Sequence, residues 1–219
     1  MKAVIVAGGE PHPADRAQLA DADLLVAADA GAHWLMDQGL TPDLIVGDMD
    51  SISPDLLAQL EARGVAIERH PTDKDASDVE LALDRAVAAG ADELVLIGAL
   101  GGERLDHELA NLMLAADEAR TSAPYELSVV RGPTRVRALH GGARLELRGA
   151  EGDIVTLLPI AGDAVGVHTQ GLRYALNGET LRMARSRGLS NLIEHPSASV
   201  ALEKGTLLVI EIAQEGGAR

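Results

Sequence analysis

The strongest constraint on the fold is a series of short runs, apolar throughout, that alternate with helical patterns over about the first 130 residues. Strands that are apolar on both faces and separated by helices are typical of a parallel sheet covered on both sides. The sequence therefore predicts an α/β domain with a mainly parallel sheet flanked by helices. The expected strands are 3–7, 24–28, 44–46, 65–67, 94–100 and 127–130, and the expected helices lie near 15–20, 32–38, 54–63, 78–89 and 106–120.

The pattern changes after about Gly132. Short alternating or β-branched runs follow, Gly-rich turns separate them, and no long helical period is present. We therefore predict an all-β sandwich or partial barrel, with domains at 1–132 and 133–219. Its expected strands are 135–139, 143–147, 154–159, 165–169, 197–202 and 206–212.

Composition excludes several classes of function. The formal net charge is −15, from 34 acidic against 19 basic residues, so the chain would repel nucleic acids and anionic membranes. No apolar run reaches the roughly 18 residues of a membrane span, and cysteine is absent, which excludes thiol chemistry. We expect a soluble, cytoplasmic protein. Any phosphate ligand must be met locally, by a cation or by backbone N–H groups.

Acidic residues gather where the predicted parallel strands end. Asp29 follows the second strand, and Asp48 and Asp50 follow the third. Ligands of open α/β sheets bind at this edge, and two carboxylates two residues apart point to the same side of an extended chain. Their mutual repulsion would be relieved by Mg²⁺, which prefers oxygen ligands. A turn that merely favours Asp and Ser is the simpler explanation for one such residue, but we consider it insufficient for the pair.

A second acidic cluster leads into the helix expected from Asp78. Stabilisation of acids at a helix N-terminus explains part of it. However, Asp75 or Asp78 would also complete a metal site begun by Asp48 and Asp50. Lys74 is one of only three lysines in the chain, and it is placed to meet a phosphate.

A third cluster, 98–107, is rich in glycine and lies between a strand and a helix, where backbone N–H groups can approach phosphate or ribose. Arg104 suits a phosphate and Asp106 a ribose or base group, and Asn111 lies one turn beyond. The cluster matches neither the dinucleotide-binding nor the P-loop pattern.

In the β half, Tyr174 and the pair Ser190-Asn191 are the candidate ligand residues, since the pair can hydrogen-bond an amine-bearing heterocycle. A core tyrosine and an ordinary turn are the simpler alternatives. The seven histidines show no metal-ligand spacing.

Taken in order, these segments resemble the thiamine pyrophosphokinase family over nearly the whole chain. The most specific pairing is Gly47-Asp48-Met49-Asp50-Ser51 followed by the run Asp73–Asp78. The other matching segments are 28–32, 80–83, 101–111, 171–176 and 190–191. The chain departs from the family pattern at Ala30, at Ala175 and at Leu192-Ile193.

The resemblance implies a nucleotide-binding α/β domain, a thiamine-binding β domain, and a homodimer that holds thiamine between the α/β domain of one subunit and the β domain of the other. It implies transfer of pyrophosphate from Mg²⁺-bound ATP to the thiamine hydroxyl, with AMP released. By motif, the catalytic carboxylates are Asp48, Asp50 and Asp78, and the predicted Mg²⁺ ligands are these three with Asp75. The predicted nucleotide contacts are Asp29, Lys74, Asp75, Ser77, Arg104, Asp106 and Asn111, and the thiamine contacts are Tyr174, Ser190 and Asn191.

Two alternatives stay open from the residues alone. A related pyrophosphokinase would act on another hydroxymethyl heterocycle, such as a pterin, and a nucleotide-sensing module would bind without turnover. The acidic clusters argue against the sensing module, and the segments 171–176 and 190–191 argue for thiamine.

Overall fold

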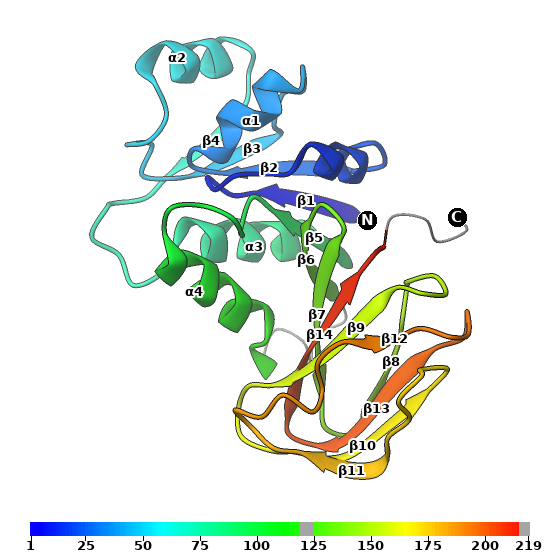
Figure 1. Cartoon of the computed structure of the whole chain (residues 1–219). Helices are drawn as coiled ribbons and strands as arrows, with labels where there is room; N and C mark the ends of the chain where they lie inside the picture. Colours follow the sequence, from blue (N-terminus) through cyan, green and yellow to red (C-terminus); the bar gives the residue numbers. More distant parts are fainter. Residues whose placement is uncertain (119–124, 215–219) are drawn as a thin grey trace. The chain divides into compact units, whose positions relative to one another are not determined.

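The computed structural model describes residues 1–118 and 125–214, and the chain divides into two compact units (Figure 1). One unit contains residues 1–114 and strand β6, and the other contains the chain from Pro133 onward together with residues 115–118. Within the described residues, no helix has the length and apolar character needed to cross a membrane.

The first unit is built on a parallel sheet with the strand order β6-β5-β1-β2-β3-β4. Its central strands are buried on both faces, which explains why they are apolar throughout. The strand order reverses direction between β1 and β5. The strands are β1 (Lys2–Val6), β2 (Leu24–Ala28), β3 (Leu44–Gly47), β4 (Ala66–Arg69), β5 (Glu93–Ile97) and β6 (Glu126–Arg131).

Helices α1 and α2 cover one face of this sheet and α3 covers the other (Figure 1). Trp34, the only tryptophan of the chain, lies on α1 and packs against the core, half-buried. The Ser53 hydroxyl caps α2 ahead of Pro54, as the Ser-Pro pair predicts. The helical elements are the 3₁₀ helix η1 (Pro13–Leu19), α1 (Gly31–Asp37), α2 (Pro54–Ala62), α3 (Asp78–Ala88) and α4 (Leu105–Ala115).

The second unit consists of two antiparallel sheets, with the orders β12-β9-β14-β7 and β11-β10-β13-β8. Apolar side chains from both sheets form one core, which makes the unit a β-sandwich. Its strands are β7 (Thr134–His140), β8 (Ala143–Glu146), β9 (Ile154–Pro159), β10 (Ala164–Gln170), β11 (Asn177–Leu181), β12 (Asn191–Leu192), β13 (Ser199–Lys204) and β14 (Thr206–Ile212).

This architecture confirms the predicted fold class. Three details differ from the expectation. The first expected helix is a 3₁₀ helix, held by the buried carboxylate of Asp15, which accepts from the His12 and Gly132 amides. Strands β11 and β12 were not predicted, because the first is polar and the second has only two residues. Helix α4 ends at Ala115, and the last two residues of the expected 106–120 helix lie outside the described part of the chain.

Candidate functional site

Parallel strand register brings Asp29 next to Asp48. Ala28, the last residue of β2, pairs with Val46 of β3, and the Asp29 amide donates to the Val46 carbonyl at 2.9 Å. Both strands therefore end at the same edge of the sheet, and the residue that follows each carries a carboxylate. This edge lies outside the carboxyl ends of the strands, where ligands of α/β sheets bind.

Helix α3 supplies a third carboxylate at the same edge. The Ser77 hydroxyl accepts from the Glu80 amide at 3.2 Å, so the helix begins at Asp78. One oxygen from each of Asp29, Asp48 and Asp78 lies within 4.8 Å of the other two. A Cβ on Gly47 would lie 3.0 Å from the Asp29 Cβ and 3.3 Å from the Asp78 Cγ, so the absence of a side chain there lets the carboxylates gather.

Two residues around these carboxylates have backbone conformations that residues other than glycine rarely adopt. Asp29 has φ 45° and Met49 has φ 67°. Met49 is buried, and the flanking Asp48 and Asp50 are joined by a hydrogen bond from the Asp50 amide to Asp48 Oδ1 at 3.1 Å. The left-handed turn at Met49 therefore buries the apolar side chain and leaves both flanking carboxylates at the edge.

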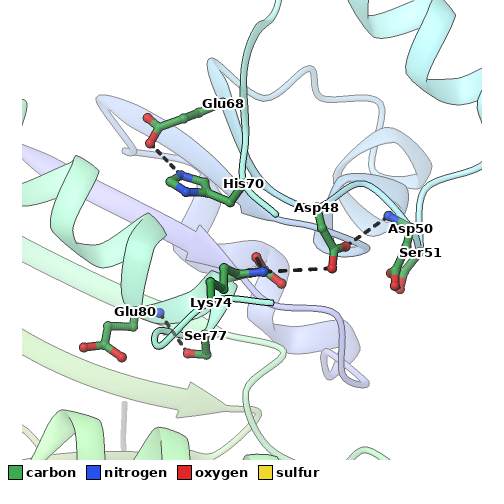
Figure 2. Close-up of polar contacts among 9 residues, drawn as sticks. Asp48, Asp50, Ser51, Glu68, His70, Lys74, Ser77 and Glu80 are labelled. Atoms are coloured by element: carbon green, nitrogen blue, oxygen red, sulfur yellow. Dashed lines mark hydrogen bonds and ion pairs between the residues drawn. The ribbon is translucent and has the colours of Figure 1, made fainter. Parts of the chain in front are cut away.

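The Lys74 ammonium lies among the carboxylates (Figure 2). Its Nζ is 3.1 Å from Asp78 Oδ1 and 3.9 Å from Asp48 Oδ2, and its side chain is only 14% exposed. Apart from this ion pair at Asp78 Oδ1, the buried Oδ1 atoms of Asp29 and Asp78 have no hydrogen-bond partner among the described residues. Carboxylate oxygens that are gathered and partly buried, with few hydrogen-bond donors, fit a divalent cation with oxygen ligands.

Two carboxylates of the cluster, Asp29 and Asp48, have shifted pKa values. Burial raises the pKa of Asp29, and the charges of Asp78, Asp48 and Asp50 raise it further, against an opposing hydrogen bond from Ser51. Hydrogen bonding from the Asp50 amide lowers the pKa of Asp48, and Thr72 and Lys74 act in the same direction. Asp48 is therefore favoured in its ionised form, whereas the ionised form of Asp29 is disfavoured by burial and by the neighbouring negative charges.

Several neighbours of the site had no signal in the sequence. Thr72 hydrogen-bonds Asp48. Glu68 binds His70 at 2.7 Å (Figure 2). Both carboxylate oxygens of Glu68 also bind Arg85, which fixes the end of β4 to α3. These residues lie in runs without a recognisable pattern, and only the fold brings them together.

Glycines line the loops after β1 and β5, where the strand order reverses. The Gly9 amide donates to the Gly98 carbonyl at 2.9 Å, and a Cβ on Gly9 would lie 2.3 Å from that oxygen. Buried Asn111 donates from Nδ2 to the Ala99 carbonyl at 3.1 Å. Asn111 thus holds the Gly-rich loop against α4, which makes a close backbone approach to a ligand feasible at this position.

Other predicted residues are placed apart from the three-carboxylate group. Asp50 and Asp75 are exposed and lie outside that group. Arg104 and Asp106 are both exposed and pair with each other at 2.6 and 2.9 Å, and this pairing lowers the pKa of Asp106.

The second unit contains a pocket of about 230 Å³, and two of the predicted thiamine contacts, Tyr174 and Asn191, line it. Tyr174 is 62% exposed at its wall, and Asn191 is buried beneath it. Ser190, next to Asn191, is exposed and has φ 57°. Arg187 also lines the pocket and is paired with Glu179, and no sequence pattern singles it out.

Comparison with known proteins assigns both halves. Residues 16–126 match the model described as thiamin pyrophosphokinase, catalytic domain, and residues 143–207 match the one described as thiamin pyrophosphokinase, vitamin B1 binding domain. The chain belongs to the thiamine pyrophosphokinase family. A thiamine pyrophosphokinase of Bacillus subtilis is 26% identical over 208 residues, which cover 94% of this chain and 96% of that protein. One from Arabidopsis thaliana is 26% identical over 223 residues, covering 89% and 80%.

Solved structures of the family have the same fold. The crystal structure of thiamine pyrophosphokinase from Bacillus subtilis superposes with a TM-score of 0.84 at 24% identity, covering 98% of this chain and all of that one. The structure from Geobacillus thermodenitrificans has a TM-score of 0.81 at 25% identity, with both chains fully covered.

Family membership settles the class of reaction. The chain is an enzyme, a diphosphotransferase that uses ATP as the donor and thiamine as the acceptor. Neither the pterin-type acceptor nor the non-catalytic sensor is favoured by any relative.

The raised pKa of Asp29 predicts a stability effect that depends on pH. A carboxyl group whose folded pKa exceeds its unfolded value stabilises fully below the unfolded value, and this contribution is lost as pH rises through the folded pKa. Asp29→Asn removes the charge, and asparagine tolerates the left-handed backbone. We expect the metal-free variant to be more stable than wild type at pH 7 by about 1 kcal/mol, and the gain to shrink as pH falls toward the unfolded Asp value of 3.8.

Urea unfolding in a chelator, at neutral and at acidic pH, measures this difference. Asp73→Asn, an exposed position in the loop before α3, is the matched control and should change little. Equal stability of Asp29→Asn and wild type at both pH values would contradict the prediction.

Proposed function

We propose that Asp29, Asp48 and Asp78 hold Mg²⁺ at the edge of the parallel sheet, and that Asp50 and Asp75 reach the metal–nucleotide complex from the exposed side. The single observation that carries this proposal is the group of three carboxylate oxygens within 4.8 Å of one another, together with the buried Asp29 Oδ1, which has no hydrogen-bond partner among the described residues. Mg²⁺ bound there supplies positive charge to the phosphates, which an acidic protein would otherwise repel.

In the proposed reaction, the thiamine hydroxyl oxygen attacks the β-phosphorus of ATP in line with the bond to the α-phosphate bridge. A new O–P bond forms, the bond to AMP breaks, and AMP leaves with the bridging oxygen and its electron pair. One of the clustered aspartates accepts the hydroxyl proton. Catalysis then rests mainly on positioning and electrostatics, as is usual for transfer of phosphoryl groups.

Lys74 is proposed to contact the phosphates. Its ammonium is already held at the carboxylate cluster by Asp48 and Asp78, so a polyphosphate that arrives there meets a positioned cation. The loops that contain Gly9 and Gly98 are proposed to receive the nucleotide, with Asn111 holding the second loop in place. Ser77 acts through the cap that begins α3. Arg104 and Asp106, an exposed pair, are proposed to exchange their mutual contact for contacts to the nucleotide.

We assign nucleotide and Mg²⁺ binding to domain 1–132 and thiamine binding to domain 133–219. The pocket bounded by Tyr174 and Asn191 supports the second assignment, because it lies inside the segment that matches the vitamin B1 binding domain. Ser190 is exposed beside this pocket and is proposed to hydrogen-bond thiamine.

The working form is proposed to be a homodimer with thiamine at the subunit interface, located in the cytoplasm. Helix α4 supports the dimer, since Leu105, Leu109 and Met113 are 66%, 51% and 49% exposed. At intervals of four residues they form one apolar stripe along the helix. A second copy of the chain would cover it.

Release of AMP tests the reaction directly. With ATP and Mg²⁺ present, we expect AMP to form only when thiamine is added, and mass spectrometry should identify thiamine diphosphate as the product. AMP formed with a pterin alcohol and not with thiamine would change the acceptor, and the absence of AMP with any acceptor would contradict the proposed reaction.

Asp48→Asn tests the metal site. Loss of one ligand carboxylate should lower kcat by roughly hundredfold or more, because the positive charge at the phosphates is weakened. Binding of Mn²⁺ in the presence of nucleotide, followed by electron paramagnetic resonance, should weaken in parallel. Asp73→Asn is again the control, and wild-type Mn²⁺ binding in Asp48→Asn would remove Asp48 from the site.

Leu109→Glu tests the dimer. A glutamate in the middle of the apolar stripe should shift the mass in light scattering from twice 22.8 kDa toward 22.8 kDa and lower turnover with it. Val165→Glu places the same charge at an exposed apolar position of the second unit and should leave the mass unchanged. A dimeric Leu109→Glu protein would exclude this stripe as the interface.

A further inference from the structure

The side chain of Asn191 is engaged almost entirely by backbone groups. Its Oδ1 accepts from the Tyr174 amide at 2.9 Å and from the Leu192 amide at 2.9 Å, and its Nδ2 donates to the Tyr174 carbonyl at 2.8 Å. An amide oxygen has two lone pairs, and both are used here. Asn191 is also buried, at 7% exposure. Its oxygen therefore has no capacity left to accept a hydrogen bond from an amine-bearing ligand.

These contacts bind two separate segments together. One is the loop that contains Tyr174, and the other is the segment 188–191. Asn191 imitates a strand neighbour, since it offers an acceptor and a donor to both backbone groups of Tyr174. The Tyr174 backbone is therefore fixed by a side chain seventeen residues away.

The segment 188–191 is itself held against β9. The Leu157 amide donates to the Gly188 carbonyl at 2.8 Å, and the Ser190 amide donates to the Thr156 hydroxyl at 3.1 Å. A Cβ on Gly188 would lie 2.0 Å from the Leu157 carbonyl oxygen, so only glycine fits there. Asn191 therefore lies on a segment that is hydrogen-bonded to β9, and its side chain connects the loop that contains Tyr174 to that segment.

The pocket of the second unit lies between the two joined segments. Tyr174, Ala175 and Leu176 line it from one segment, and Gly188, Leu189 and Asn191 line it from the other. Tyr174 is 62% exposed, so its side chain gains little fixation from packing. Its position at the pocket wall depends on its backbone, and the Asn191 side chain binds both the N–H and the C=O group of that residue.

We propose that Asn191 is a positioning residue, which acts on thiamine through Tyr174 and not by accepting a hydrogen bond from it. This inference rests on the proposed assignment of thiamine to this pocket. It changes the expected role of Asn191 from ligand contact to a clamp that sets the shape of the pocket.

Asn191→Asp separates the two roles by the direction of the effect. Aspartate has nearly the same shape and keeps both acceptor bonds, but it cannot donate to the Tyr174 carbonyl, and two oxygens then face each other. A clamp predicts that the KM for thiamine rises about tenfold, the usual effect of one lost hydrogen bond, with a smaller change in kcat. A direct acceptor predicts an unchanged or lower KM, because a carboxylate would bind a cationic, amine-bearing ligand at least as well.

Gln170→Glu is the matched control for charge. It adds one negative charge to an exposed residue of the same unit, where Arg144 already provides a partner, and should leave the KM unchanged.

A double-mutant cycle with Tyr174→Ala gives a second, independent readout. If Asn191 acts through Tyr174, Asn191→Asp should weaken thiamine binding in the wild-type background and have almost no effect in Tyr174→Ala. Tyr174 is exposed, so its truncation leaves the core intact. Additive effects, measured by calorimetry with thiamine, would overturn the proposal.

Failure of the proposed function gives a different result. In that case the wild-type protein releases no AMP with thiamine and binds none in the calorimeter. An active wild type with a fall or no change in the KM of Asn191→Asp would overturn only the positioning role.

Discussion

Three carboxylates within 4.8 Å of one another repel at neutral pH, and the first unit is arranged around that repulsion. Two of them follow paired parallel strands, so the sheet register alone holds them together, and the third begins a capped helix. Gly47 leaves the space between them, and the Lys74 ammonium offsets part of the charge. The fold is therefore stable enough to hold an arrangement that is itself unfavourable without the cation that we propose, which is a common property of functional sites.

Left-handed backbone at residues other than glycine occurs in both proposed ligand regions. Asp29 belongs to the carboxylate group, Met49 follows Asp48 of that group, and Ser190 lies beside the pocket of the second unit. Such conformations cost about 1 kcal/mol or more each and persist only where surrounding contacts impose them. At Asp29 this contact is the hydrogen bond from its amide to the Val46 carbonyl. At Ser190 it is the hydrogen bond from its amide to the Thr156 hydroxyl. A hydrogen bond from the backbone amide of a left-handed residue thus fixes a carboxylate in one unit and the loop beside the pocket in the other.

The sequence predicted the first unit well because buried parallel strands are apolar throughout, and this signal needs no knowledge of partners. It failed at β11, whose Asn-Gly-Glu-Thr run is polar, and at the two-residue β12. Local spacing predicts Asp48 and Asp50 as metal ligands, completed by Asp75 or Asp78, and of these the structure places Asp48 and Asp78 in the three-carboxylate group. The sequence predicts that Asp29 contacts the nucleotide. Only the pairing of Ala28 with Val46 shows that Asp29 lies beside Asp48. Asn191 was expected to contact thiamine, since no sequence pattern shows that its amide is occupied by Tyr174.

The position of Trp34 has an experimental consequence. It is the only tryptophan, it lies on α1 immediately after the Asp29 turn, and the second unit contains none. Intrinsic tryptophan fluorescence therefore reports on the α/β unit alone, while circular dichroism senses both units. Melting curves recorded by the two signals coincide only if both halves unfold together, so one aromatic side chain makes the coupling between the halves observable without any label.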